Sequence, residues 1–284
     1  MLTVLLALSI AVAVLAAAVW VAGGREPVYR IARGTPAFVA ALRYAGAPVE
    51  PALAAGVAEV WRGDARHGLI GPASSYWDRF LVLAGGSPGE MPLLLGPEVT
   101  DAYVAEVSLM RPPKLALGAF RLLRATGLWR IPEGETWRGE ARDGIRPAML
   151  PAPENVAWLL AQPESYRPAM FNFLKYAPRA SYPAPRAGDP GSGAEAYGRY
   201  GAVALRTVMR TGGQLHFAGR IKVVLRQAAA WEMGNDWDDL AVMRYPRPDA
   251  ILSMERVEAY RASLRHRDAG LAATIVTATD ATIR

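Results

Sequence analysis

Residues 169–176 read AMFNFLKY, and this strand-like run decides the fold of the last third of the chain. Large apolar and aromatic side chains between turn signals favour a buried strand. Ser192 and Glu195 then form a capping box that opens a helix, which ends at Gly212. Three further strands are expected over 214–227, 239–245 and 273–278, with a second helix over 249–265.

The predicted order of these elements is βαββαβ, the ferredoxin-like arrangement. Four antiparallel strands then carry two helices on one face and leave the other face bare. A bare apolar sheet face needs a cover, and a second sheet is the natural one. We therefore expect this sheet to pack against another sheet, supplied by the first half of the chain or by a neighbouring molecule.

An internal repeat indicates where a second sheet would come from. Residues 77–83 (WDRFLVL) align with residues 237–243 (WDDLAVM), and Pro88 aligns with Pro248. Residues 36–44, near the start of this copy, have helical spacing. We predict four regions: an N-terminal segment over 1–23, a degenerate ferredoxin-like module over 24–118, a helix with a Pro/Gly-rich linker over 119–168, and the second module over 169–284.

The N-terminal segment is continuously apolar. Residues 1–22 carry no charged side chain, and about 20 apolar residues in a helix cross the hydrocarbon core of a bilayer. We interpret residues 1–23 as a transmembrane anchor. The alternative is a cleaved signal peptide with Ala16 and Ala18 at its cleavage site. The absence of an early basic residue and the length of the apolar run favour the anchor.

Basic residues follow this segment, and none precedes it. Arg25, Arg30 and Arg33 are the first of them, and lipid headgroups are their natural partner. The positive-inside rule places the bulk of the chain in the cytoplasm. The expected location is therefore a single-pass protein of a membrane, the inner membrane if the source is bacterial, and the exported orientation stays open.

Composition excludes several kinds of site. The 284 residues include no cysteine, which rules out disulfides, thiolate metal sites and cysteine nucleophiles. The 3 histidines lack the spacing of metal ligands, so no metal or cofactor is expected. The net charge of +6 comes from arginines scattered among acidic residues, which does not favour nucleic acid as a partner. No phosphate-loop, dinucleotide-binding, zincin or nucleophile-elbow motif occurs.

Short motifs of the last third follow one another in a fixed order. They are MFNFLKY at 170–176, AYGRYG at 196–201, AGR at 218–220, WD at 237–238, YP at 245–246 and HRDAGL at 266–271. In this order and spacing they resemble the DUF1330 family of the dimeric α/β-barrel superfamily. The resemblance implies that two ferredoxin-like units close sheet to sheet as a pseudo-dimer, so the expected fold class is α+β. It also implies a cavity between sheet and helices. Superfamily relatives include cofactor-free monooxygenases, isomerases and haem-binding barrels, so the resemblance implies a fold more than a reaction.

Five side chains are candidates for lining such a cavity: Asn172, His216, Trp231, Trp237 and His266. Asn172 lies in mid-strand, where a buried amide either orients a ligand or bonds to neighbouring backbone. His216 is either a base or haem ligand, or an ordinary hydrogen-bonded strand residue. The two tryptophans either stack on a planar ligand or anchor the core. His266 either lines the cavity or complements the negative pole of a helix end.

The expected function is that of a membrane-anchored binding or structural module for a small hydrophobic ligand or a protein partner. Two alternatives stay open. One is a cofactor-free monooxygenase or isomerase whose cavity is lined by Asn172, His216 and a nearby tryptophan. The other is an accessory subunit of a larger membrane complex, with residues 131–153 as its contact arm. No catalytic constellation in the sequence separates these three classes.

Overall fold

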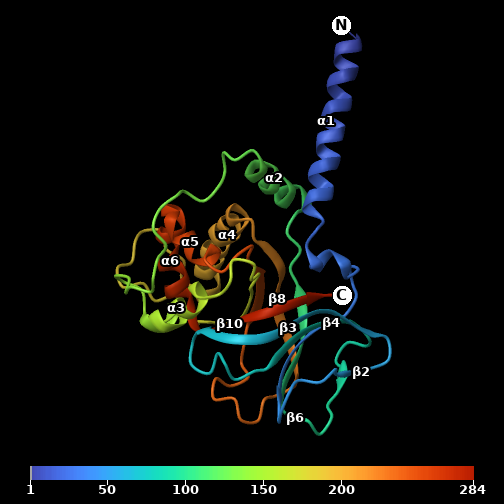
Figure 1. Ribbon diagram of the computed structural model, residues 1–284, viewed down its shortest axis with the longest axis vertical. Helices are drawn as coiled ribbons and strands as arrows, with labels where there is room; N and C mark the ends of the chain where they lie inside the picture. Colours follow the sequence, from blue (N-terminus) through green and yellow to red (C-terminus); the bar gives the residue numbers. More distant parts are fainter. Residues whose placement is uncertain (1) are drawn as a thin grey trace.

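The centre of the protein is a closed barrel of antiparallel strands. The computed structural model describes the backbone of residues 2–284 and the side chains from Ser9 onward, apart from Ala11. The eight strands follow the order β1-β4-β3-β10-β7-β9-β8-β6 around the barrel, whose strands lie below the helices α4 to α6 (residues 193–270) in Figure 1. They are β1 (Ala37–Tyr44), β3 (Val57–Ile70), β4 (Arg79–Gly85), β6 (Val99–Leu109), β7 (Ala169–Tyr176), β8 (Gln214–Arg226), β9 (Asp239–Arg244) and β10 (Leu271–Ile283).

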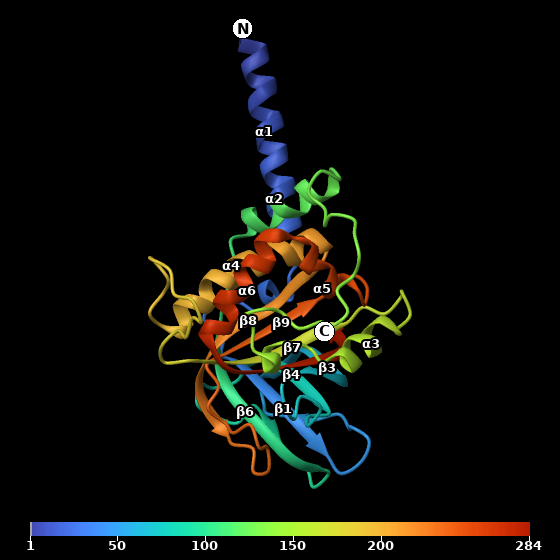
Figure 2. The same ribbon diagram turned by 90° about the vertical axis from the view of Figure 1, so that its left-hand side faces the viewer.

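Helices cover the outer face of the second half of this barrel. The helix α4 (Gly193–Thr211) follows β7, whereas α5 (Ala250–Ser253), η3 (Met254–Arg256) and α6 (Glu258–Gly270) lie between β9 and β10. Figure 2 shows α4 and α6 side by side over these strands. The predicted capping box is confirmed, because Ser192 and Glu195 satisfy each other's backbone N–H groups, and Gly212 ends α4 in the left-handed conformation.

The first half of the barrel is built differently. Between residues 37 and 109, all of which are described, the connections contain no α-helix. A two-stranded sheet of β2 (Ala52–Leu53) and β5 (Leu93–Leu94) lies there instead, and Leu93 packs with outward side chains such as Phe38 and Leu81. The prediction of helical spacing over 36–44 is wrong. Those residues form β1, which is buried on both faces and therefore shows no strand alternation.

The predicted fold class of two ferredoxin-like modules in a pseudo-dimer is therefore wrong. The first half lacks the helices that such a module requires. The two halves also share one continuous sheet, because β3 pairs with β10 and β6 pairs with β8. This pairing leaves the barrel without a free strand edge. Both halves do place their strands in the same order, β6-β1-β4-β3 and β10-β7-β9-β8. The boundaries at residues 24, 119 and 169 stay predictions.

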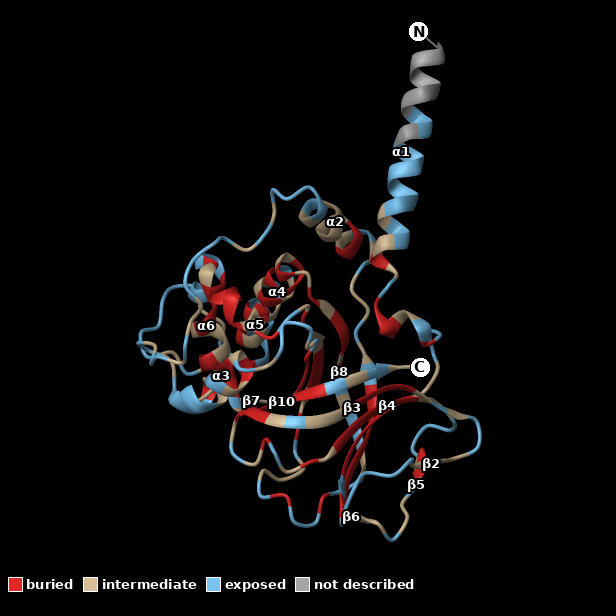
Figure 3. Cartoon of the chain, viewed as in Figure 1, coloured by how far each residue is buried: buried red, intermediate tan, exposed pale blue. Residues whose placement is uncertain are grey.

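The helix α1 (Leu2–Gly23) projects from the barrel, and Figure 3 shows its described surface as mostly exposed. Among the residues whose side chains are described, no helix is both long and apolar enough to cross a membrane. This finding overturns the predicted anchor over 1–23 and, with it, the single-pass membrane location and its cytoplasmic orientation. The side chains of residues 1–8 and 11, which belong to the predicted anchor, lie outside the described residues.

Three further helical segments connect the halves. They are α2 (Lys114–Ala125), η2 (Pro147–Met149) and α3 (Pro153–Leu160), and a short helix η1 (Pro27–Arg30) precedes β1. The base of α1 packs against α2 through glycines, since a Cβ atom added at Gly118 would lie 1.8 Å from the carbonyl oxygen of Val19. The segment 131–153, expected as a contact arm, packs on this same chain, where the Arg146 backbone N–H and side chain both donate to Asp268.

Candidate functional site

A small cavity lies between the outer face of β7, β9 and β10 and the helices α4 to α6. Its volume is about 70 Å³. Cavities of about 150 Å³ hold a benzene molecule, so this one suits a molecule of a few heavy atoms. Its polar lining consists of Asn172, Tyr197, Tyr200, Tyr245, Tyr260 and Arg267, together with Thr274. Methionines and aliphatic side chains complete the wall.

Asn172 projects from β7 into this lining. Its Nδ2 donates to the carbonyl oxygens of Met170 and Ala241, each at 2.9 Å. Both partners are acceptors, which sets the orientation of the amide. The Oδ1 atom then has no hydrogen-bond partner among the described residues and is available to a donor on a ligand. Asn172 therefore combines both roles expected from the sequence, a bond to neighbouring backbone and a place in the cavity wall.

Four tyrosines supply hydroxyl groups from the helices and from the end of β9. The hydroxyls of Tyr200 and Tyr260 lie 3.3 Å apart, and that of Tyr245 donates to the sulfur of Met254. The Tyr197 ring packs against Tyr200. Burial raises the pKa of Tyr197, Tyr245 and Tyr260 above the usual value of 10. These hydroxyls therefore keep their protons at neutral pH and act as hydrogen-bond donors.

Arg267 is the only charged residue among those that line the cavity. It lies in the last turn of α6, where its Nη2 donates to the carbonyl oxygen of Met149 and its guanidinium stands 5.7 Å from the Tyr200 ring centre. Its Nε atom is withdrawn from solvent and has no hydrogen-bond partner. Burial lowers the pKa of Arg267, but Tyr200 and Tyr260 outweigh burial, and the pKa lies above its usual value. The group is therefore a permanent cation.

The acidic residues close to Arg267 are already engaged. Glu255 pairs with Arg142 at 3.0 Å, and Asp268 pairs with Arg146 at 3.1 Å. Within the part of the chain that the structure describes, no carboxylate forms an ion pair with Arg267. Arg267 is half-buried, and Glu255 lies near enough to interact with it electrostatically without forming an ion pair. The cavity wall thus contains a cation that has no direct ion pair with a carboxylate of the described chain.

His216 lies elsewhere, fully buried in β8. Its Nδ1 accepts a hydrogen bond of 3.1 Å from Nε1 of Trp61, so the proton of the neutral ring resides on Nε2. That Nε2–H group has no partner. Burial lowers the pKa of His216 to about 3. A general base at neutral pH needs a pKa near 7, so this histidine is unsuited to that role.

The remaining candidates also lie outside the cavity. Trp231 and Trp237 stack at 5.2 Å within the barrel interior, which is filled by aromatic side chains, so they anchor the core. The Nδ1 atom of His266 lies 2.8 Å from the hydroxyl of Tyr182 at the far side of α6. No group of three or more His, Asp or Glu side chains in the described chain could hold a metal ion.

The arginines after α1 do not line this cavity. Arg25, Arg30 and Arg33 are exposed, and Arg30 donates to the carbonyl oxygen of Arg284 at 2.9 Å. Lipid as their partner stays a prediction.

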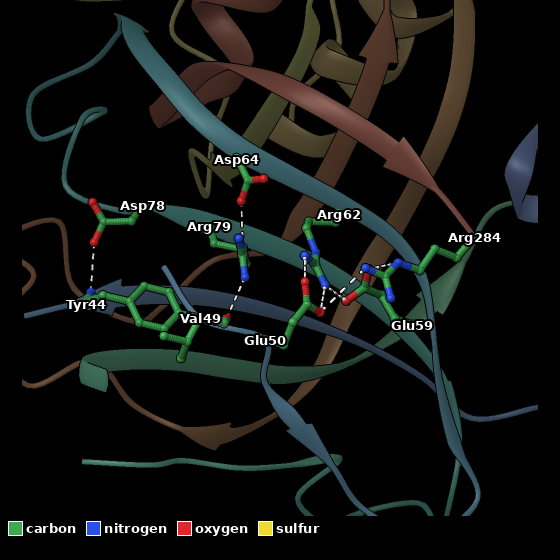
Figure 4. A network of polar contacts seen from close by, with 9 residues as sticks. All are labelled: Tyr44, Val49, Glu50, Glu59, Arg62, Asp64, Asp78, Arg79 and Arg284. Atoms are coloured by element: carbon green, nitrogen blue, oxygen red, sulfur yellow. Dashed lines mark hydrogen bonds and ion pairs between the residues drawn. The ribbon is translucent and has the colours of Figure 1, made fainter. Parts of the chain in front are cut away.

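The largest network of charges lies on the first half of the barrel (Figure 4). Arg62 contacts both Glu50 and Glu59, and Glu59 also pairs with Arg284 at 3.0 Å. Arg79 pairs with Asp64 at 2.6 Å and donates to the Val49 carbonyl oxygen. Positive and negative groups are matched here. The network therefore holds the loop before β3 in place and leaves no cation free for a ligand.

A wider groove of about 370 Å³ lies on the other side of α6. Arg142, Arg186, Arg261 and Arg265 are among its lining residues. Two of these are already paired, Arg142 with Glu255 and Arg265 with Asp189 at 2.7 Å. The small cavity is less open to solvent than this groove, so it is the stronger candidate for a site that encloses a small ligand.

Sequence reasoning missed Arg267 and all four tyrosines. Tyr197 and Tyr200 lie on one face of the predicted helix, which is a detectable signal, but such a face is usually interpreted as core. Arg267 belongs to the HRDAGL motif at 266–271. Nothing in that motif reveals that its guanidinium turns inward without a carboxylate partner.

Comparison with known proteins adds little to this geometry. No family model and no curated protein matches the chain. Among solved structures, the chain is similar to RPA0582, a protein of unknown function from Rhodopseudomonas palustris, with 26% identity over 47% of this chain and 94% of that one and a TM-score of 0.38. Methylated RPA0582 gives 27% identity over 47% and 92%, with a TM-score of 0.39. The resemblance to the DUF1330 family accordingly stays a prediction.

Proposed function

We propose that this protein binds a small molecule in the cavity between β7, β9 and β10 and the helices α4 to α6. One observation carries the proposal: the Nε–H group of Arg267 and the Oδ1 atom of Asn172 have no hydrogen-bond partner among the described residues, and both residues line a small, largely apolar cavity. This combination is typical of ligand sites. Leaving such groups unpaired costs about 1–3 kcal/mol each, and a bound molecule offsets that cost. The proposal keeps the small ligand expected from the sequence, but this ligand is also bound through polar groups and is not purely hydrophobic.

The chemistry of the lining favours binding over catalysis. A cofactor-free monooxygenase or isomerase needs a group that gains and loses a proton near neutral pH. The pKa of Tyr197, Tyr245 and Tyr260 is raised by burial, and Arg267 stays protonated. Asn172 and Thr274, which also line the cavity, do not titrate. The expectation of an accessory subunit of a larger complex has no specific observation in its favour.

Methionine methyl groups give a direct readout of occupancy. Of the 9 methionines, Met170, Met243 and Met254 line the cavity. The full-length protein, labelled with ¹³C at the methionine methyls, is titrated with acetate, acetamide and isopropanol, each of four heavy atoms. The best small ligands reach about −1.5 kcal/mol per heavy atom, so the tightest possible Kd is on the order of 0.05 mM. We expect saturable shifts at these three methyls in the millimolar range.

A cavity-filling variant provides the control. Ala204 is buried in the cavity wall, whereas Ala202 on the same helix is exposed. We expect Ala204→Leu to abolish the shifts and Ala202→Leu to leave them unchanged. If no probe gives a saturable shift in the unaltered protein, or if Ala204→Leu binds as well as Ala202→Leu, the proposal is wrong.

A further inference from the structure

We propose that the ligand of this cavity is a small monocarboxylate and that Arg267 binds its carboxylate group. This inference rests on the proposed function and adds the chemical class of the ligand. It depends on three features of the site: an unpaired cation, the donors around it, and the space available.

The first feature is the state of the Arg267 guanidinium. Its direct contacts are the carbonyl oxygen of Met149 and the side chain of Tyr200, and neither carries a negative charge. Its Nε–H group is buried and unpaired. A carboxylate is the group that a guanidinium binds with two parallel hydrogen bonds. Glu255 and Asp268 form their ion pairs with Arg142 and Arg146, so neither carboxylate occupies the free side of the Arg267 guanidinium, and a ligand carboxylate can bind there.

The second feature is the distribution of donors and acceptors. Tyr197, Tyr200 and Tyr260 line this cavity, and a hydroxyl group can donate a hydrogen bond to an anion. Asn172 uses both N–H groups on backbone carbonyls, so it offers only an oxygen. An oxygen acceptor disfavours a carboxylate beside it. We therefore expect the carboxylate to face α4 and α6, with the rest of the ligand directed toward β7.

The third feature is size and total charge. A volume of about 70 Å³ is near half that of a cavity that holds benzene, so the ligand has few heavy atoms. Arg267 is the only charged residue in the lining. One carboxylate neutralises it, whereas a dicarboxylate would leave a second charge buried and unpaired. A monocarboxylate such as acetate matches both limits.

Acetate and acetamide provide the matched test, since they differ in charge and hardly in shape. In the methionine-methyl titration of the full-length protein, we expect acetate to bind at least tenfold more tightly than acetamide, as a charge-assisted hydrogen bond predicts. The variant Arg267→Gln is expected to lose at least tenfold in acetate affinity while its affinity for acetamide changes by less than about twofold. Arg267→Lys keeps the charge and should retain part of the preference.

The outcomes separate this inference from the proposed function. Binding of acetamide or isopropanol with no preference for acetate would overturn the monocarboxylate and leave a small-molecule site. Equal binding of sodium nitrate and sodium acetate would overturn the carboxylate, because the site would then select charge alone. Acetate shifts that persist in Ala204→Leu would show binding outside the cavity and would overturn both. The acetate-to-acetamide ratio of the unaltered protein decides the matter even if Arg267→Gln does not fold.

Discussion

The buried pair of Trp61 and His216 predicts a specific loss of stability in acid. Burial lowers the pKa of His216 to about 3 in the folded protein, against about 6.5 for an exposed histidine. Between these values the unfolded chain binds one more proton than the folded chain. The free energy of unfolding therefore falls by about 1.4 kcal/mol for each pH unit below 6.5. This contribution is fully present above pH 6.5 and is lost progressively toward pH 3.

The variant His216→Asn isolates this contribution. Its side-chain oxygen can accept the hydrogen bond from Nε1 of Trp61, and it does not titrate. Urea unfolding of both proteins is followed by tryptophan fluorescence from pH 7.0 to 4.5. Between pH 6.0 and 4.5 we expect the unaltered protein to lose about 2 kcal/mol more than the variant. Carboxyl groups whose pKa burial raises, such as Glu26 and Asp239, act in the opposite direction but are common to both proteins.

A direct titration completes the test. In the folded protein the imidazole signals of His216 should not move between pH 7.0 and 4.5. A difference in unfolding free energy between the two proteins that stays constant with pH would refute the reasoning, because it would mean that His216 has a similar pKa in both states.

Three further changes have expected outcomes. Ser192→Ala removes the cap of α4 and should lower the unfolding free energy by about 1 kcal/mol, measured as a fall in Tm of about 2–4 °C; an unchanged Tm would contradict this. Asp78→Ala leaves the backbone N–H of Tyr44 unpaired, and Asp238→Ala leaves that of Tyr176 unpaired. Each variant should lower the free energy of unfolding, measured in urea, by about 1–3 kcal/mol. The corresponding asparagine variants should have unfolding free energies between those of the alanine variants and the unaltered protein. Gly118→Ala should separate α1 from α2 and speed amide hydrogen exchange over 114–125. Gly198→Ala serves as the control: the space around Gly198 is open, so this variant should leave the exchange rates over 114–125 unchanged.

Local patterns determined much of the second half of the chain. The run at 169–176 and the capping box at Ser192 depend on neighbouring residues, so a strand and a helix start could be predicted there. The repeat of Trp-Asp at residues 77 and 237 also has a structural counterpart. Asp78 and Asp238 accept hydrogen bonds from backbone N–H groups at the ends of β1 and β7. These features rely on interactions that the adjacent sequence specifies.

Closure of the barrel and the candidate site were decided by the tertiary structure alone. The pairings of β3 with β10 and of β6 with β8 join residues far apart in the chain, and β1 is buried on both faces, so its pattern could not be told from a helix. Closure of the barrel also places Trp231 and Trp237 in the core of its interior, although their sequence context made them candidates for lining a pocket. Arg267 is recognisable as a site residue only in the folded protein, where it lies beside Tyr200 and where Glu255 and Asp268 form ion pairs with Arg142 and Arg146. An absent partner is a property of three-dimensional packing, and no local pattern encodes it.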